Sequence, residues 1–174
     1  MVTGHRPSGL GGYKYNEIHK FVQTELENII LRATEAPRAS DGIVLISGMA
    51  LGVDQWFVEI AIRHGIPFHA YIPFKGQESN WPEHSQGKYK LLLSKAKEVV
   101  TCSPGGYEAQ KMYIRNQRMV DDADYCIAVW DGSKGGTEHA VHAAMKKGIE
   151  IYRIDPKAKT AGWMSYPKQQ ELPL

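Results

Sequence analysis

A glycine-rich turn between an apolar run and a helix is the first stretch of this sequence that could do chemistry. Gly132, Gly135 and Gly136 lie within six residues, and Thr137 opens an alanine-rich segment that ends at Gly148. Free backbone N–H groups at the start of a helix attract anions, and small residues let a ligand come close. The turn therefore predicts a phosphate site, with a tight turn that binds nothing as the alternative, because a short glycine motif is weak evidence.

The rest of the sequence supplies elements that can position this turn. Short apolar runs predict six strands, at 1–3, 43–47, 66–72, 98–102, 125–130 and 149–154. Apolar residues that recur at three and four predict five helices between them, at about 15–33, 56–64, 83–97, 109–122 and 137–148. This alternation is typical of an α/β fold, a mainly parallel sheet of about six strands with helices on both faces. We expect one domain over 1–155 and an irregular tail at 156–174.

The residues with useful chemistry follow the predicted strands. The loops at 4–12, 48–54, 74–81, 103–106 and 131–137 each come directly after a strand. Ligands of open parallel sheets bind beyond the carboxyl ends of the strands, so we expect all five loops to face one crevice. The ligand-binding candidates are Thr3, Gly4, His5, Arg6, Gly48, Met49, Gly52, Asp54, Trp81, Arg115, Asn116, Gly132, Gly135, Gly136 and Thr137.

Several candidates have a structural alternative to a ligand-binding role. Arg115 could clamp a phosphate with two N–H groups or form a surface salt bridge. Asp54 could bind ribose hydroxyls or cap a helix by accepting backbone N–H bonds. Trp81 could stack on a base or cover the edge of the sheet. Asn116 could hold a loop backbone or a ribose hydroxyl, and Arg6 suits a phosphate or a carboxylate partner.

Composition and charge narrow the classes of partner. The net charge of +2 argues against a clamp for a polyanion, so a nucleic acid is not the expected partner. No apolar run approaches the length of about 18 residues that a membrane span needs, and no signal-peptide core precedes the first strand, so we expect a soluble cytoplasmic protein. Cys102 and Cys126 lack metal-site spacing and are expected as free thiols. We expect no metal and no cofactor.

The motifs resemble those of a known superfamily. Five separated motifs occur in order over about residues 1–155: TGHRP with LGGY, SGMALGVD, IPFKGQESNWP, RNQRMVDDAD and WDGSKGGTEHAV. In this they resemble the SLOG superfamily of Rossmann-like proteins, and within it a small bacterial and phage group of unknown function. Its relatives include LOG-type phosphoribohydrolases, DprA DNA-processing proteins and sensor domains. The resemblance implies a Rossmann-like three-layer sandwich with a pocket for a nucleotide, ADP-ribose-like or cyclic nucleotide ligand, and it makes a homodimer reasonable.

The resemblance is incomplete at the residues that carry hydrolysis. Arg115 and Met119 match the Arg and Met that LOG enzymes carry on the preceding helix, but Ala140 stands where those enzymes have a catalytic Glu. We therefore expect binding, for sensing or sequestration. One alternative is a nucleotide N-glycoside hydrolase in which Glu138 and Arg115 are catalytic, although Glu138 could equally serve the helix dipole. DprA-like binding of single-stranded DNA is a second alternative.

Overall fold

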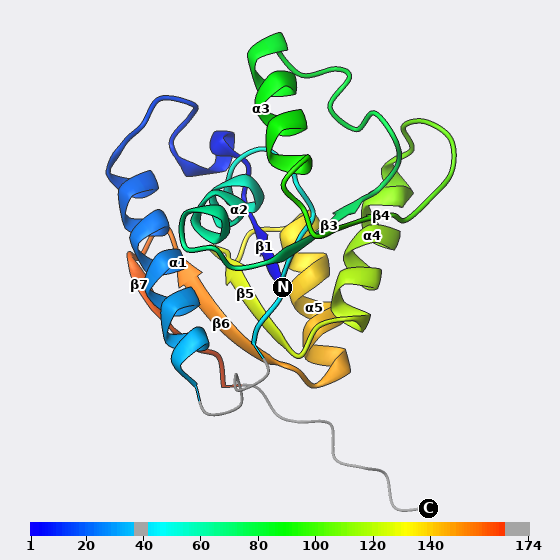
Figure 1. Cartoon of the computed structure of the whole chain (residues 1–174). Coiled ribbons are helices and arrows are strands. Elements are labelled where there is room, and N and C mark those ends of the chain that lie inside the picture. Colours follow the sequence, from blue (N-terminus) through cyan, green and yellow to red (C-terminus); the bar gives the residue numbers. More distant parts are fainter. Residues whose placement is uncertain (37–41, 166–174) are drawn as a thin grey trace, which may run out of the picture.

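Short strands form the centre of the molecule in the computed structural model, which describes residues 1–36 and 42–165 (Figure 1). The strands are β1 (Val2–Gly4), β2 (Leu45–Ser47), β3 (Phe68–Ile72), β4 (Glu98–Thr101), β5 (Tyr125–Val129), β6 (Glu150–Asp155) and β7 (Thr160–Trp163). The helices are α1 (Glu17–Glu35), α2 (Val53–Arg63), α3 (Glu83–Leu93), α4 (Ala109–Asp121) and α5 (Gly136–Lys147), with a short 3-10 helix, η1 (Pro7–Leu10). The structure thus confirms the α/β class, although α3 ends at Leu93 rather than Lys97.

The strands pair in two groups rather than in one sheet. β1-β5-β6-β7 form a four-stranded sheet and β2-β3-β4 a three-stranded one, parallel throughout except for β7, which is antiparallel to β6. β1 contacts β2, but no ladder of backbone hydrogen bonds joins these two three-residue strands. The expectation of one sheet of about six strands is therefore wrong. Apolar runs predict strands, but they do not predict which strand edges pair.

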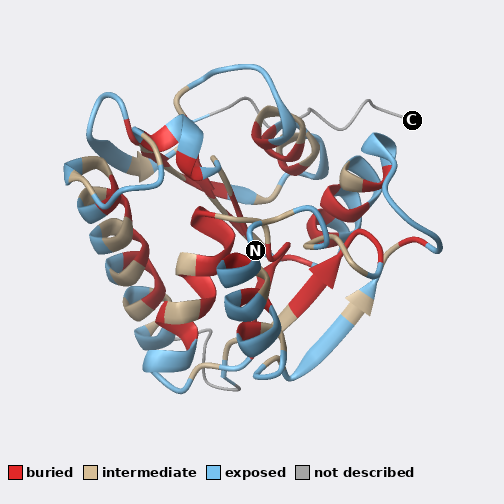
Figure 2. Ribbon diagram, turned by 90° about the horizontal axis from the view of Figure 1, so that it is seen from above, coloured by how far each residue is buried: buried red, intermediate tan, exposed pale blue. Residues whose placement is uncertain are grey.

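Helices cover both faces of the strands. Alternate residues of the strands enter two separate clusters: Val2, Ala70 and Val129 pack with α1, α2 and α3, whereas Ala128 and Ile151 pack with α4 and α5. In Figure 2 the buried residues lie on the helix sides that turn toward the strands, and exposed residues lie on the outside. The two clusters are the two faces of a three-layer arrangement, as expected.

The segment after Asp155 is not wholly irregular, because β7 pairs with β6. Asp155 Oδ1 accepts hydrogen bonds from the backbone N–H groups of Lys157 and Ala158, both at 3.0 Å. A carboxylate that caps its own turn in this way reverses the chain. The sequence did not predict this hairpin, because the Pro and Lys residues of the turn indicated irregular structure. Residues 166–174 of the expected tail, and 37–41 of the connection after α1, lie outside the described residues.

Close packing brings the loops after β1, β2 and β5 together. Gly4 at the end of β1 pairs with Val129 at the end of β5, so the loops that follow leave the same sheet edge. A Cβ on Gly4 would lie 2.6 Å from Cγ1 of Val53. Glycine therefore lets the start of α2 approach β1, which places the 48–54 loop beside the other two.

Candidate functional site

A cleft of about 420 Å³ lies at the carboxyl ends of β1 and β5, between α4 and the start of α5. Of the residues predicted from the sequence, those on its lining are Thr3, Gly4, His5, Arg6, Asp54, Arg115, Asn116, Gly135, Gly136 and Thr137. Sequence reasoning did not select the remaining lining residues, which are Val2, Ala50, Tyr107, Ala109, Met112, Tyr113, Met119, Ser133 and Lys134. The loops after β1, β2 and β5 thus meet at one cleft, as parallel topology predicts. The loops at 74–81 and 103–106 supply none of its lining, so the expectation that all five loops face one crevice is met only in part.

Arg115 is buried on the cleft lining, with 7% of its surface exposed. Its Nη1 donates a hydrogen bond to the carbonyl oxygen of Gly48, and its Nε donates to Asn116 Oδ1 at 3.0 Å. Burial lowers the pKa of the guanidinium, while the nearby Asp54 acts in the opposite direction. The group still keeps its charge, because arginine is not deprotonated in proteins. Arg115 is therefore not a surface ion pair; it is a buried cation that ties α4 to the 48–54 loop.

Gly48 is explained by this arginine. A Cβ at Gly48 would lie 1.7 Å from Nη1 of Arg115, so any larger residue would force the guanidinium out of its place. Gly52 is also required by packing, since it has a φ of +93° and its Cβ would meet the carbonyl oxygen of His5 at 2.9 Å. Both glycines therefore shape the site without lining the cleft.

Asp54 is a buried carboxylate beside Arg115. Its Oδ2 accepts a hydrogen bond from the backbone N–H of Ala50 at 3.2 Å and lies 3.8 Å from Nη1 of Arg115. Burial raises the pKa of Asp54, and the charge of Arg115 opposes that rise. The side chain holds its own loop and does not cap α2, whose N-cap is Gly52, so the capping role considered for it is wrong. Because Asp54 also lines the cleft, its place is compatible with the ligand-binding role.

Asp131 holds His5 at the cleft. His5 Nε2 lies 3.0 Å from Asp131 Oδ1, whose partner oxygen Oδ2 lies 2.6 Å from Nζ of Lys157. Hydrogen bonds from Lys157 and from Ser133 lower the pKa of Asp131. The carboxylate therefore joins the loop after β1, the loop after β5 and the β6–β7 turn.

The start of α5 forms one wall of the cleft. Asn116 Nδ2 donates to the carbonyl oxygen of Gly136 at 3.1 Å, which fixes α4 against this helix end. Glu138 Oε2 accepts a hydrogen bond from the backbone N–H of Gly135 at 3.4 Å. Glu138 therefore caps its own helix and does not line the cleft, so its placement favours the dipole role over the catalytic one.

Three other predicted residues also lie away from the cleft lining. The ring of Trp81 packs edge-on against Tyr89, with centroids 5.4 Å apart, at the margin of the core that α1, α2 and α3 share. Met49 is fully buried, and Gly132 is exposed with a φ of +88° in the loop after β5. The placement of Trp81 favours the covering role that we considered for it over base stacking.

The lining of the cleft has an excess of positive charge. Arg6, Lys134 and Arg115 are its cations and Asp54 its only carboxylate among the described residues. Arg6 and Lys134 are exposed, and no ion pair engages either of them in the described part of the chain. A cleft with this balance attracts anions.

One side of α4 completes the cleft with apolar groups. Ala109, Met112, Tyr113 and Asn116 follow one another at helical spacing and all line the cleft. The sequence pattern predicted only a helix here, because a periodicity of 3.6 residues is the same whether a helix faces a core or a cavity. Nothing in the pattern itself could have separated the two.

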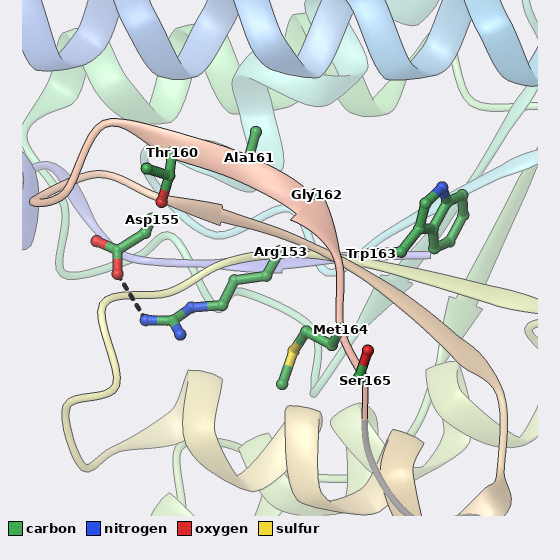
Figure 3. Close-up of a pocket in the computed structure, with 8 residues that line it drawn as sticks. All are labelled: Arg153, Asp155, Thr160, Ala161, Gly162, Trp163, Met164 and Ser165. Atoms are coloured by element: carbon green, nitrogen blue, oxygen red, sulfur yellow. Dashed lines mark hydrogen bonds and ion pairs between the residues drawn. The ribbon is translucent and has the colours of Figure 1, made fainter.

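A second hollow, also of about 420 Å³, lies along the β6–β7 hairpin. Arg153 is the one cation among the described residues of its lining. Figure 3 shows that Arg153 points toward Asp155, and the two side chains form an ion pair of 2.6 Å. Arg153 Nε also donates to the carbonyl oxygen of Trp130 at 2.8 Å. The charged groups of this hollow satisfy each other, so the first cleft is the better candidate site.

The described residues offer neither a metal site nor a membrane span. Among them, no group of three or more His, Cys, Asp or Glu side chains could hold a metal ion. Asp122, part of the acidic run after α4, accepts hydrogen bonds from Tyr71 Oη at 2.7 Å and Arg118 Nε at 2.9 Å. Of the helices described, none has the length and apolar character to cross a membrane.

Comparison with known sequences identifies relatives over almost the whole chain. A sequence profile of the YspA SLOG family matches residues 1–157. A UPF0398 protein of Bacillus cereus strain B4264 is 32% identical over 162 residues, which cover 87% of this chain and 85% of that protein. A UPF0398 protein of Bacillus thuringiensis strain Al Hakam is 33% identical over 161 residues, with the same coverage of both chains.

Solved structures share the fold at low sequence identity. DNA processing protein A (DprA) from Streptococcus pneumoniae superposes with a TM-score of 0.62 at 18% identity, over 88% of this chain and 49% of that one. The protein TM1055 superposes with a TM-score of 0.53 at 16% identity, over 86% of this chain and 69% of that one. These similarities support the Rossmann-like architecture and say nothing further about this chain.

Proposed function

The chain belongs to the YspA SLOG family, and from that membership and the geometry of the cleft we propose that it binds a nucleotide-derived small molecule, for sensing or sequestration. A nucleotide, an ADP-ribose-like molecule or a cyclic nucleotide would present the phosphate and ribose groups that such a cleft suits. The observation that carries the proposal is the cationic lining at a helix start. The cleft lining beside the first turn of α5 contains three cations, Arg6, Lys134 and Arg115, and one carboxylate, Asp54, among the described residues.

The phosphate would lie against the start of α5. The first N–H groups of a helix have no intrahelical acceptor and carry partial positive charge, so Gly136 and Thr137 can donate to an anion. Arg115 would add a buried cation, because an arginine has five N–H donors and two hydrogen bonds to protein acceptors are formed here. Asp54 would accept hydrogen bonds from ribose hydroxyls.

A thermal-shift screen tests the proposal. AMP, ADP, ADP-ribose, NAD and cyclic nucleotides are added in turn, with ribose 5-phosphate as the probe that lacks a base. A ligand at 100 times its Kd stabilises the folded state by about 2.7 kcal/mol, which corresponds to a rise in Tm of about 5 °C or more in a chain of this size. Stabilisation that disappears in the Arg6→Ala and Lys134→Ala variants would support the proposal, and no stabilisation by any nucleotide would contradict it.

Hydrolysis of the N-glycosidic bond is a second candidate, favoured by one observation. Asp54 is a carboxyl group on the cleft lining whose pKa is raised by burial, and such groups are candidate general acids. In this mechanism Asp54, and not Glu138, would be the catalytic carboxyl group. Mass spectrometry of each stabilising nucleotide after long incubation separates the candidates, because binding alone returns the ligand intact and hydrolysis returns a free base.

DNA binding is tested separately. A gel shift with single-stranded DNA at low and high salt would show a salt-dependent complex if cationic contacts to phosphates hold it. The fold similarity to DprA alone does not favour this function, and the few exposed cations of the cleft suit a small anion.

A further inference from the structure

We propose that Tyr107 and Tyr113 form an aromatic wall on which the base of the ligand stacks, so that the cleft selects phosphates that carry a base. The inference rests on the proposed function, and it assigns a specificity role to two residues for which the sequence predicted none. Both side chains line the same cleft as Arg6, Lys134 and Arg115. The cleft thus combines aromatic surface with cationic groups, which matches a ligand that has a planar ring and a phosphate.

The two rings remain open to solvent although neighbours hold them in place. Tyr107 is 68% exposed and Tyr113 is 44% exposed. Tyr107 meets the ring of Phe74 edge-on, with centroids 6.1 Å apart, and Tyr113 lies against His139 at 4.5 Å. These contacts position each ring and leave much of its surface uncovered. Stacking on a base would cover this surface at little cost in side-chain entropy.

One side of α4 carries both a tyrosine of the aromatic wall and a residue beside the anion-binding groups. Tyr113 and Asn116 are one helical turn apart and both line the cleft, with a rise between them of about 4.5 Å. Asn116 contacts Arg115 and Gly136 at the buried end, whereas Tyr113 is at the exposed end. A ligand lying along this side of α4 would reach the start of α5 with its phosphate and the tyrosines with its base.

Exposed tyrosines elsewhere provide a matched comparison. Tyr13 is 71% exposed, on the loop before α1, and does not line the cleft. If the aromatic surface of Tyr107 and Tyr113 has no role in binding, its removal should change ligand affinity as little as removal of Tyr13 does. If the rings stack on a base, only the cleft tyrosines should affect affinity, and only for ligands that carry a base.

The experiment is calorimetric titration of AMP, GMP, CMP and UMP, each compared with ribose 5-phosphate, into five proteins. These are the wild type and the Tyr107→Ala, Tyr113→Ala, Tyr107→Phe and Tyr13→Ala variants, with circular dichroism to confirm that each is folded. Removal of a stacking ring should weaken binding of the best nucleotide by about tenfold or more. Affinity for ribose 5-phosphate should stay unchanged, and the Phe and Tyr13 variants should match the wild type.

Two failures can be told apart. Wild-type binding of a nucleotide that neither alanine substitution weakens would overturn the aromatic wall and leave the proposed function standing. Equal losses for the nucleotide and for ribose 5-phosphate would also overturn the wall, because they would show a general change in the cleft. If the folded wild type binds neither these four nucleotides nor any ligand of the thermal-shift screen, both the wall and the proposed function are overturned.

Discussion

Replacement of Gly48 by alanine would place a side chain where a buried guanidinium now lies. The new Cβ would be 1.7 Å from Nη1 and 2.4 Å from Cζ of Arg115, whereas ordinary contacts between heavy atoms need about 3.5 Å. Gly48 is not among the glycines with positive φ, so its backbone accepts alanine without strain. The guanidinium must therefore move out of its place.

The Gly48→Ala variant loses stability because two groups lose their partner when the guanidinium moves. Arg115 would lose its hydrogen bond to the Gly48 carbonyl, and the buried Asp54 would lose the cation beside it. Leaving a buried charge without its partner costs about 3 kcal/mol. For a chain of this length the corresponding fall in Tm is about 6–12 °C. Urea unfolding followed by tryptophan fluorescence, together with thermal melts, measures both quantities.

Two comparisons show whether the steric conflict with Arg115 is the cause. Gly87 lies in α3, and a Cβ added there would meet no atom within 4 Å, so Gly87→Ala should be neutral or stabilising by up to about 1 kcal/mol. In an Arg115→Ala background, Gly48→Ala should cost less than about 1 kcal/mol, because the two substitutions remove the same contact. The remaining neighbour of the new Cβ, Asp54 Oδ2 at 2.9 Å, is a side-chain end that can shift into the space that the arginine leaves. An equal loss of stability with and without Arg115, or a loss no larger than that of Gly87→Ala, would show that the conflict with Arg115 is not the cause.

Two further predictions concern the start of α5 and the carboxylate that joins the loops. Glu138→Ala should lower stability in urea by about 1 kcal/mol and leave nucleotide affinity unchanged, because the side chain caps its helix; a large loss of affinity with unchanged stability would contradict this. Asp131→Asn should be destabilising at neutral pH, because the lowered pKa of Asp131 means that its charged form stabilises the folded state above its unfolded pKa of about 3.9. This contribution should fade as the pH falls below about 4 toward the lower folded value, so a difference between variant and wild type that stays constant down to pH 2 would contradict the assignment.

The sequence predicted the helices, the strands other than β7 and the edge where the candidate cleft lies, for identifiable physical reasons. Apolar runs and helical periodicity placed the helices and most strands, since burial on two faces leaves a strong pattern. Parallel topology then brought the loops at Arg6, Asp54 and Thr137 to one edge. These inferences needed only local patterns and a general rule about such sheets.

What the sequence did not predict depends on contacts between distant residues. The acceptor of Arg115 is the carbonyl of Gly48, 67 residues away. Nothing near either residue signals that the glycine makes room for the arginine. Trp81 packs against Tyr89 of the following helix. β7 follows a turn that Asp155 caps, although the composition of this turn suggested irregular structure. Tyr113 lies at a core-like spacing but lines a cavity, a distinction that only tertiary packing makes.

Calorimetric titration of the most stabilising nucleotide into the wild type and an Arg6→Ala/Lys134→Ala double variant tests whether the cationic cleft binds a nucleotide. Both cations are exposed on the cleft lining and have no ion-pair partner in the described residues, so their removal should leave Tm unchanged. We expect the wild type to bind the nucleotide and the double variant to bind it at least about tenfold more weakly, with a reduced dependence on salt. Equal affinities of the two proteins, or no binding by the wild type, would contradict it.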